Sequence, residues 1–119
     1  MKRTIGLLAA LMACGCGAEA ADLISVQSAT LRYDAPAYAG LERHEVALVV
    51  APGTDERSAC IALRCTADTG DEREMSLCVD AARTHELTVG LHAKGRCISA
   101  SGTLTHEDGS EEPFPVAVR

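Results

Sequence analysis

Apolar and polar residues alternate along most of the chain in short segments that are separated by Gly, Pro, Asp and Ser. A period of two is typical of half-buried β-strands, because successive side chains point to opposite faces of a sheet. The pattern predicts seven strands, at residues 22–33, 43–51, 58–65, 74–80, 85–92, 97–106 and 112–118.

Seven short strands in about 100 residues predict an all-β fold, a small antiparallel β-sandwich that resembles the immunoglobulin-like architecture. The resemblance covers the architecture alone, since the chain has no Trp to lie between paired cysteines and no tyrosine corner that can be placed. Residues 21–119 are expected to form this single domain, and residues 1–20 an export signal and tether region.

The first predicted strand changes its apolar parity along its length. Ile24 and Val26 share one parity, whereas Ala29 and Leu31 share the other. A β-bulge near residues 27–28 would place both pairs on one face.

One segment fits two structures. Across residues 71–83 apolar residues stand at i, i+3, i+4 and i+7, as on one helix face, and residues 69–72 resemble a capping box. Met75, Leu77 and Val79 alternate equally well as a strand. A helix here would make the fold α+β, which is the alternative to the all-β prediction.

The C-terminal strands are predicted to form a meander. With a three-residue turn whose Gly109 is left-handed, the apolar residues share one face when Leu104 pairs with Glu112, Gly102 with Phe114, Ala100 with Val116 and Ile98 with Val118. Because prolines at 113 and 115 lack N–H donors, strand 112–118 is expected at a sheet edge. Strand 85–92 is expected to pair with strand 97–106 through a loop at 93–96, with Leu91 facing Ile98 and Val89 facing Ala100.

The N-terminus has the pattern of a bacterial signal peptide: two basic residues, an apolar run at residues 5–13 and then small residues. Leu11-Met12-Ala13-Cys14 resembles the lipobox of bacterial lipoproteins, and the resemblance implies lipidation of Cys14. The competing site, Ala18-Glu19-Ala20, would release a chain that begins at Ala21, and lipid on Cys16 is a third option. The apolar run is too short for a transmembrane helix, and no later stretch is long enough.

Charge limits the partners. The net charge is −6, and it becomes more negative once residues 1–20 are removed. An acidic surface repels nucleic acid and anionic headgroups, so no nucleic-acid partner is expected.

After residue 20 the chain keeps four cysteines, at 60, 65, 78 and 97, which suits two disulfides. Their spacing lacks the C-x2-C knuckles of zinc sites. If residues 60–65 form one strand, its ends lie roughly 16 Å apart, beyond disulfide reach. Cys60 and Cys65 are therefore each expected to bond to Cys78 or Cys97.

Three His-Glu pairs begin at His44, His85 and His106, and His92 is a fourth imidazole. Adjacent strand residues point to opposite faces, so these pairs cannot readily chelate one ion, and surface histidines without a metal are expected.

Two polar patterns remain. Asp68, Asp71 and Glu72 around Gly70 lack the spacing of a calcium loop and are expected to form a solvated acidic turn. A hydroxyl-rich sheet face, which could bind a glycan or another protein, is expected at Thr88, Ser99, Ser101, Thr103 and Thr105.

No nucleophile elbow, phosphate-binding loop or dinucleotide fingerprint is present, so neither enzymatic activity nor a cofactor is expected. The sequence favours a lipid-anchored envelope protein, facing the periplasm or the cell surface, that acts as a binding or structural module. The alternatives are a periplasmic metal-binding protein that uses surface histidines and, for localisation, a soluble periplasmic or secreted chain.

Overall fold

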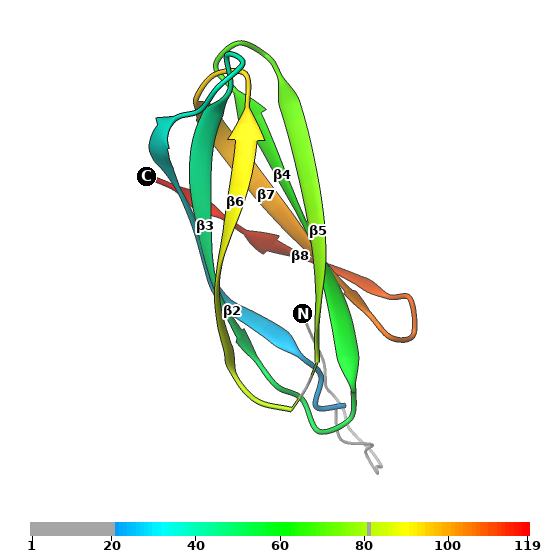
Figure 1. Ribbon diagram of the computed structural model, residues 1–119. Coiled ribbons are helices and arrows are strands. Elements are labelled where there is room, and N and C mark those ends of the chain that lie inside the picture. The colour runs from blue at the N-terminus through cyan, green and yellow to red at the C-terminus, as the bar shows by residue number, and fades with distance from the viewer. Residues whose placement is uncertain (1–20, 81) are drawn as a thin grey trace.

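The structure, a computed structural model, describes residues 21–80 and 82–119, and the alternating segments in it are strands (Figure 1). Along the chain they are β2 (Ser25–Pro36), β3 (Glu42–Ala51), β4 (Ser58–Ala67), β5 (Glu72–Asp80), β6 (His85–Ala93), β7 (Cys97–His106), β8 (Glu111–Pro115) and β9 (Ala117–Val118).

The strands form two four-stranded sheets that enclose one core. The sheet orders are β6-β3-β2-β9 and β5-β4-β7-β8, and every pair is antiparallel except β2 with β9. Both sheets contribute inward residues to the core, among them Leu31, Leu48, Ile61 and Leu104, each at most 2% exposed. The predicted all-β, immunoglobulin-like sandwich is confirmed.

The predicted bulge in the first strand is also confirmed. The register of β2 against β3 shifts between Val26 and Ser28. The shift leaves Ile24, Ala29 and Leu31 all buried, although their positions differ in parity.

The helix predicted as the alternative for residues 71–83 is wrong. Residues Glu72–Asp80 form β5, which pairs with β4 from Thr66↔Glu72 to Ser58↔Asp80. Val79 points into the core, and Met75 and Leu77 pack against it. The period of two therefore decides this segment, because one side of the strand must cover the sandwich interior.

The partner predicted for strand 85–92 is wrong. β6 pairs with β3 in the first sheet, and the chain then crosses to β7 in the second. Leu91 therefore does not face Ile98, nor Val89 Ala100. A register shift in β7 skips Ile98, which is 65% exposed, while Cys97 turns inward.

The C-terminal hairpin forms as predicted and then departs from the prediction. Leu104 pairs with Glu112 and Gly102 with Phe114, Gly109 has a φ of 89°, and β8 lies at the sheet edge. The pairs predicted for Val116 and Val118 are wrong. Val116 is buried, and β9 runs beside β2 in the other sheet.

The loops that connect the strands gather at two opposite ends of the sandwich. The base end, low in Figure 1, holds the start of the described chain and the loop at residues 52–57. The distal end, high in Figure 1, holds the loops at residues 37–41, 68–71 and 94–96. At the base end, Asp22 accepts hydrogen bonds from the N–H (3.1 Å) and the hydroxyl (2.9 Å) of Thr54, so the first described residues are fixed to the 52–57 loop.

Candidate functional site

Both disulfides lie in the β5-β4-β7-β8 sheet, and each has one cysteine on β4. Cys60 bonds to Cys78 of β5, and Cys65 bonds to Cys97 of β7, with Cα atoms 4.0 and 5.7 Å apart. The two β4 cysteines are five positions apart, so they face opposite sides of the sheet. The predicted pair of disulfides, with Cys60 and Cys65 bonded to different partners, is confirmed. Such bonds indicate a non-reducing environment.

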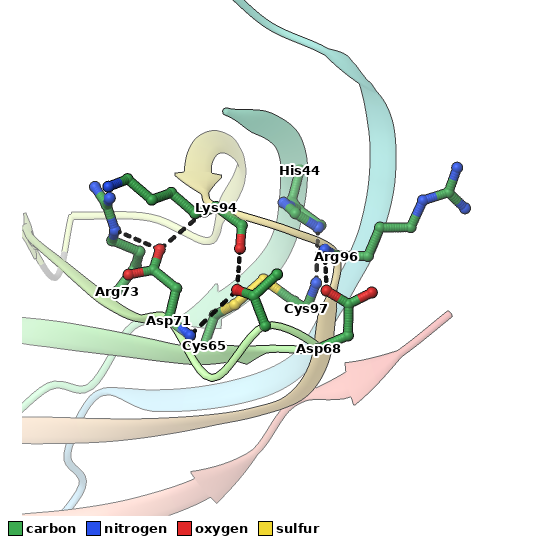
Figure 2. Close-up of a disulfide and its surroundings, with 9 residues drawn as sticks. His44, Cys65, Asp68, Asp71, Arg73, Lys94, Arg96 and Cys97 are labelled. Carbon is green, nitrogen blue, oxygen red and sulfur yellow. Dashed lines mark hydrogen bonds and ion pairs between the residues drawn. A yellow bond between two sulfur atoms is a disulfide. The ribbon is translucent and has the colours of Figure 1, made fainter. Parts of the chain in front are cut away.

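The inward disulfide, Cys65–Cys97, lies beside a buried histidine at the distal end (Figure 2). The Cys97 N–H donates to Nε2 of His44 over 3.0 Å, which links β7 of one sheet to β3 of the other. Because Nε2 accepts, a neutral His44 carries its proton on Nδ1, and that atom has no hydrogen-bond partner among the described residues. The surface position predicted for His44 is wrong, since the residue is 1% exposed.

Next to His44 lies Tyr33, one of the two tyrosines of the chain. The rings of Tyr33 and His44 meet edge to face with centroids 5.7 Å apart, and the Arg96 guanidinium lies 3.8 Å from the Tyr33 centroid. The Tyr33 hydroxyl donates to Glu42 over 2.7 Å. This hydrogen bond is the main reason that the pKa of Tyr33 is raised. The contact with Arg96 therefore holds the 94–96 loop against β2 of the other sheet.

The acidic turn predicted around Gly70 is not simply solvated. An Asp71 carboxylate oxygen accepts from the Lys94 N–H (2.8 Å), and one from Asp68 accepts from the Arg96 N–H (3.2 Å) (Figure 2). The bond from Lys94 is the largest cause of the lowered pKa of Asp71, which burial opposes. The turn therefore binds the 94–96 loop, and at Gly95 an added Cβ would overlap the Asp68 carboxylate.

The outward disulfide, Cys60–Cys78, lies on a hydroxyl-rich surface. Seven hydroxyl residues share the outer side of this sheet and define what we call the hydroxyl face: Ser58, Thr66, Ser76, Ser99, Ser101, Thr103 and Thr105. Four of the five predicted residues are included. The fifth, Thr88, lies on β6 in the other sheet. Arg64 and Glu74 form an ion pair of 3.4 Å on the hydroxyl face.

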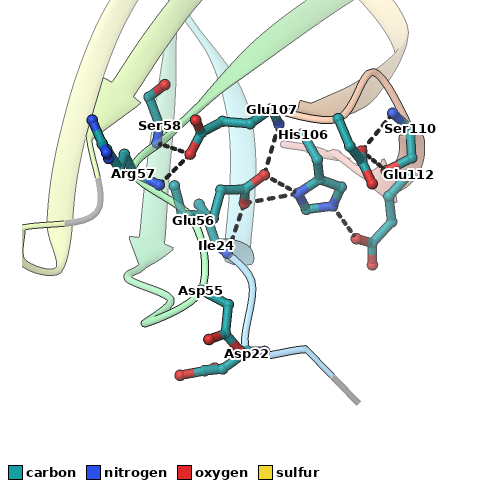
Figure 3. Close-up of polar contacts among 11 residues, drawn as sticks. Asp22, Ile24, Asp55, Glu56, Arg57, Ser58, His106, Glu107, Ser110 and Glu112 are labelled. Atoms are coloured by element: carbon teal, nitrogen blue, oxygen red, sulfur yellow. Dashed lines mark hydrogen bonds and ion pairs between the residues drawn. The ribbon is translucent and has the colours of Figure 1, made fainter.

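A second cluster joins the base end to the β7–β8 hairpin (Figure 3). The Glu56 side chain is only 2% exposed and accepts hydrogen bonds from the Ile24 N–H (3.1 Å) and the Glu107 N–H (2.8 Å). His106 Nδ1 lies 2.9 and 3.0 Å from the two Glu56 oxygens, and its Nε2 lies 3.1 Å from Glu112. Both imidazole nitrogens thus face carboxylates.

The environment of this cluster favours the ionised pair. Burial by itself would raise the pKa of Glu56, but the hydrogen bonds from His106, Glu107 and Ile24 outweigh it and lower that pKa. Burial by itself would lower the pKa of His106, but its bonds to Glu56 and Glu112 outweigh burial and raise that pKa. The pair ties the 52–57 loop, the segment just before β2 and the β7–β8 hairpin together, and neither imidazole nitrogen is left to act as a base or a metal ligand.

The surface position predicted for His106 is therefore wrong, as it is for His44. A signal for both was present in the alternation, because His44 shares its parity with Val46 and Val50, and His106 with Leu104, all of which are buried. Glu56 had no such signal, since it lies in a loop among polar neighbours.

The other two histidines lie apart from these clusters. His85 Nε2 lies 3.3 Å from an Asp80 carboxylate oxygen, and His92 is exposed on β6. Across residues 21–80 and 82–119 no three His, Cys, Asp or Glu residues are grouped so that they could hold a metal ion.

The lipidation site predicted at Cys14, with its competing sites at Cys16 and after Ala20, lies outside the described residues. Within the part that is described, no helix has the length and apolarity needed to cross a membrane.

Comparison with known proteins adds little. No protein-family model matches the chain, and no curated protein sequence is similar to it. The X-ray structure of Northeast Structural Genomics Consortium target SoR45 has a TM-score of 0.48 and 16% sequence identity, covering 84% of this chain and 90% of that chain. The strand order defines the structural class of the protein as an immunoglobulin-like β-sandwich, and both of its disulfides lie in one sheet.

Proposed function

We propose that this protein is exported, anchored by lipid on Cys14, and acts as a non-enzymatic binding or structural module of the bacterial cell envelope. The observation that carries the proposal is that every cysteine after residue 20 is in a disulfide. Disulfides persist in oxidising compartments such as the periplasm, and the signal-like residues 1–20 would direct the chain there.

The position of the first described residues suits a tether. Six residues lie between Cys14 and Ala21, and the seven steps from one to the other span at most about 25 Å when the chain is extended. A lipid on Cys14 would keep the base end near the membrane. The distal end would face outward, with Tyr38 88% exposed in its 37–41 loop.

Two surfaces are then available to a protein or glycan partner: the distal loops and the hydroxyl face. A non-enzymatic role is supported by the hydroxyl face, where none of the described histidines lies beside the hydroxyls to activate them. The net charge of −6 argues against a nucleic-acid partner.

The alternative, a metal-binding protein that uses surface histidines, has weaker support. Two of the four histidines are buried, and each makes hydrogen bonds inside the protein. No observation on the described residues favours it over the binding module.

Expression of the full chain in a bacterium, followed by fractionation and intact-mass measurement, tests the anchor. We expect the protein in the membrane fraction with an acylated N-terminus at Cys14. Cys14→Ser should abolish both results, whereas the matched variant Cys16→Ser should leave both unchanged. An unmodified soluble chain that begins at Ala21 would overturn the proposed anchor.

A further inference from the structure

We propose that the Cys60–Cys78 disulfide is a thiol–disulfide exchange site, open to an external dithiol reductant, while Cys65–Cys97 is a permanent structural bond. The inference concerns redox chemistry at the hydroxyl face. It stands apart from the anchor and binding role proposed above, since it depends only on how the two disulfides are placed.

The two disulfides differ most in how accessible they are to an external thiol. Cys65 is 0% exposed and Cys97 6%, so a thiol cannot reach them without opening the core. Cys60 and Cys78 are both exposed on the outer face. Exchange requires direct contact between an attacking thiolate and a disulfide sulfur. The outward bond is therefore the one that meets a reductant in the folded protein.

The residues around the outward bond leave that approach open. On β4 the outward neighbours two positions away are Ser58 and Ala62, and on β5 they are Ser76 and Asp80. None is longer than an aspartate. No large side chain from these positions covers the sulfur atoms.

The sheet also selects which sulfur is attacked. A thiolate attacks a disulfide in line with the S–S bond, on the side away from the leaving sulfur. Cys60 lies between β5 and β7, with Thr105 beyond it, whereas Cys78 lies on β5, the last strand of its sheet. An attacking thiolate can therefore approach the Cys78 Sγ from the sheet edge, and the Cys60 Sγ then leaves as a thiolate.

The reaction balances with a dithiol as the reductant. The first thiolate forms a mixed disulfide with Cys78, and Cys60 leaves and takes a proton. The second thiolate of the reductant then attacks the reductant's first sulfur, which is bonded to Cys78. The bond to Cys78 breaks, Cys78 leaves and takes a proton, and the reductant closes into a cyclic disulfide. Two electrons and two protons pass from the dithiol to the protein.

The pairing of β4 with β5 should persist after the disulfide is reduced. β4 and β5 stay paired in register from Ser58↔Asp80 to Thr66↔Glu72, with Cys60 opposite Cys78 within the ladder. Reduction therefore leaves two thiols held opposite each other, ready to be oxidised again.

The experiment uses the native wild-type chain. Samples are exposed to dithiothreitol, blocked with N-ethylmaleimide at timed intervals, denatured and mapped by mass spectrometry. We expect Cys60 and Cys78 to be labelled at least about ten-fold faster than Cys65 and Cys97, in protein that keeps its far-ultraviolet circular dichroism. Equal rates for the two bonds, or no labelling before denaturation, would overturn the proposal.

A brief exposure to the monothiol cysteamine, followed by the same block, tests the direction of attack. We expect cysteamine on Cys78 and maleimide on Cys60, and the reverse would overturn the assigned line of attack. Ser76→Leu, beside Cys78, should slow the reaction several-fold, whereas the matched variant Ser99→Leu, on the same face, should not. If both variants had the same effect, attack from the edge would be wrong.

Discussion

Replacing Glu56 with Gln tests the cluster at the base end. The substitution keeps the shape but turns one carboxylate oxygen into an NH2 group. Two backbone donors, Ile24 N–H and Glu107 N–H, bind different oxygens of Glu56, so one of them must lose its acceptor. His106 also loses one of its two carboxylates.

The expected loss in the free energy of unfolding follows from the burial of the Glu56 and His106 side chains. An unsatisfied buried donor costs about 1–3 kcal/mol, and a hydrogen bond to a charged group is worth about 1.5–3 kcal/mol. Both terms apply because the side chains of Glu56 and His106 are 2% and 5% exposed. We expect Glu56→Gln to lower the free energy of unfolding by about 3–5 kcal/mol, the range for breaking a buried pair.

The loss of unfolding free energy caused by Glu56→Gln should depend on pH. Because the pKa of Glu56 is lowered, its contribution is present above the usual value of 4.5 and is lost as the pH falls through its folded pKa. Because the pKa of His106 is raised, its contribution is complete below the usual value of 6.5 and is lost as the pH rises through its folded pKa. The difference between wild type and Glu56→Gln should therefore be largest between pH 4.5 and 6.5.

Urea unfolding with the disulfides intact, across this pH range, gives the required free energies. The matched control is Glu112→Gln, because Glu112 binds the same imidazole but its side chain is 63% exposed. We expect it to cost less than about 1 kcal/mol. The reasoning is refuted if the two variants cost the same, or if the Glu56→Gln loss is constant with pH.

Three other predictions concern packing, cross-linking and metal. Gly102→Ala should lower the free energy of unfolding by about 1–3 kcal/mol in thermal melts, because an added Cβ would overlap the Phe114 ring; a melt like that of wild type would show that the ring moves freely. The double variant Cys65→Ala/Cys97→Ala should lose about 2–4 kcal/mol in urea unfolding, since the bond closes a separation of 32 residues; an unchanged midpoint would contradict this. Calorimetric titration with Zn²⁺ should give no binding of micromolar strength, and such binding, if lost on substitution of an exposed histidine, would favour the metal-binding alternative.

The features predicted best from the sequence depend on local side-chain direction. Alternation located the strands, a change of parity located the bulge near Ser28, and the prolines of β8 placed it at an edge. The two cysteines of β4 have opposite parity, which separated their partners. The direction of side chains from a strand decided the strands, the bulge and the disulfide partners, and the missing N–H donors of the prolines decided the edge.

The features that were missed depend on which elements meet in space. β6 has an apolar side that suits either sheet, so its pattern could not show that it pairs with β3 rather than β7. Glu56 resembles any loop carboxylate until His106 and two backbone N–H groups are brought around it. These contacts join residues 32 to 51 positions apart, and no short-range pattern encodes them.

The parallel pairing of β2 with β9 determines how the molecule bears a mechanical load. Thr30 lies beside Ala117, Leu31 lies beside Val118, and the Arg119 N–H donates to the Leu31 carbonyl oxygen over 2.8 Å. The two strands run in the same direction, so a pull on the start of β2 and the end of β9 drives them past each other. Their bonds are then loaded together in shear and must break at once instead of opening one by one. In single-molecule stretching, pulling from these two ends should need more force than pulling apart the β7–β8 hairpin, whose bonds open in sequence from its free end.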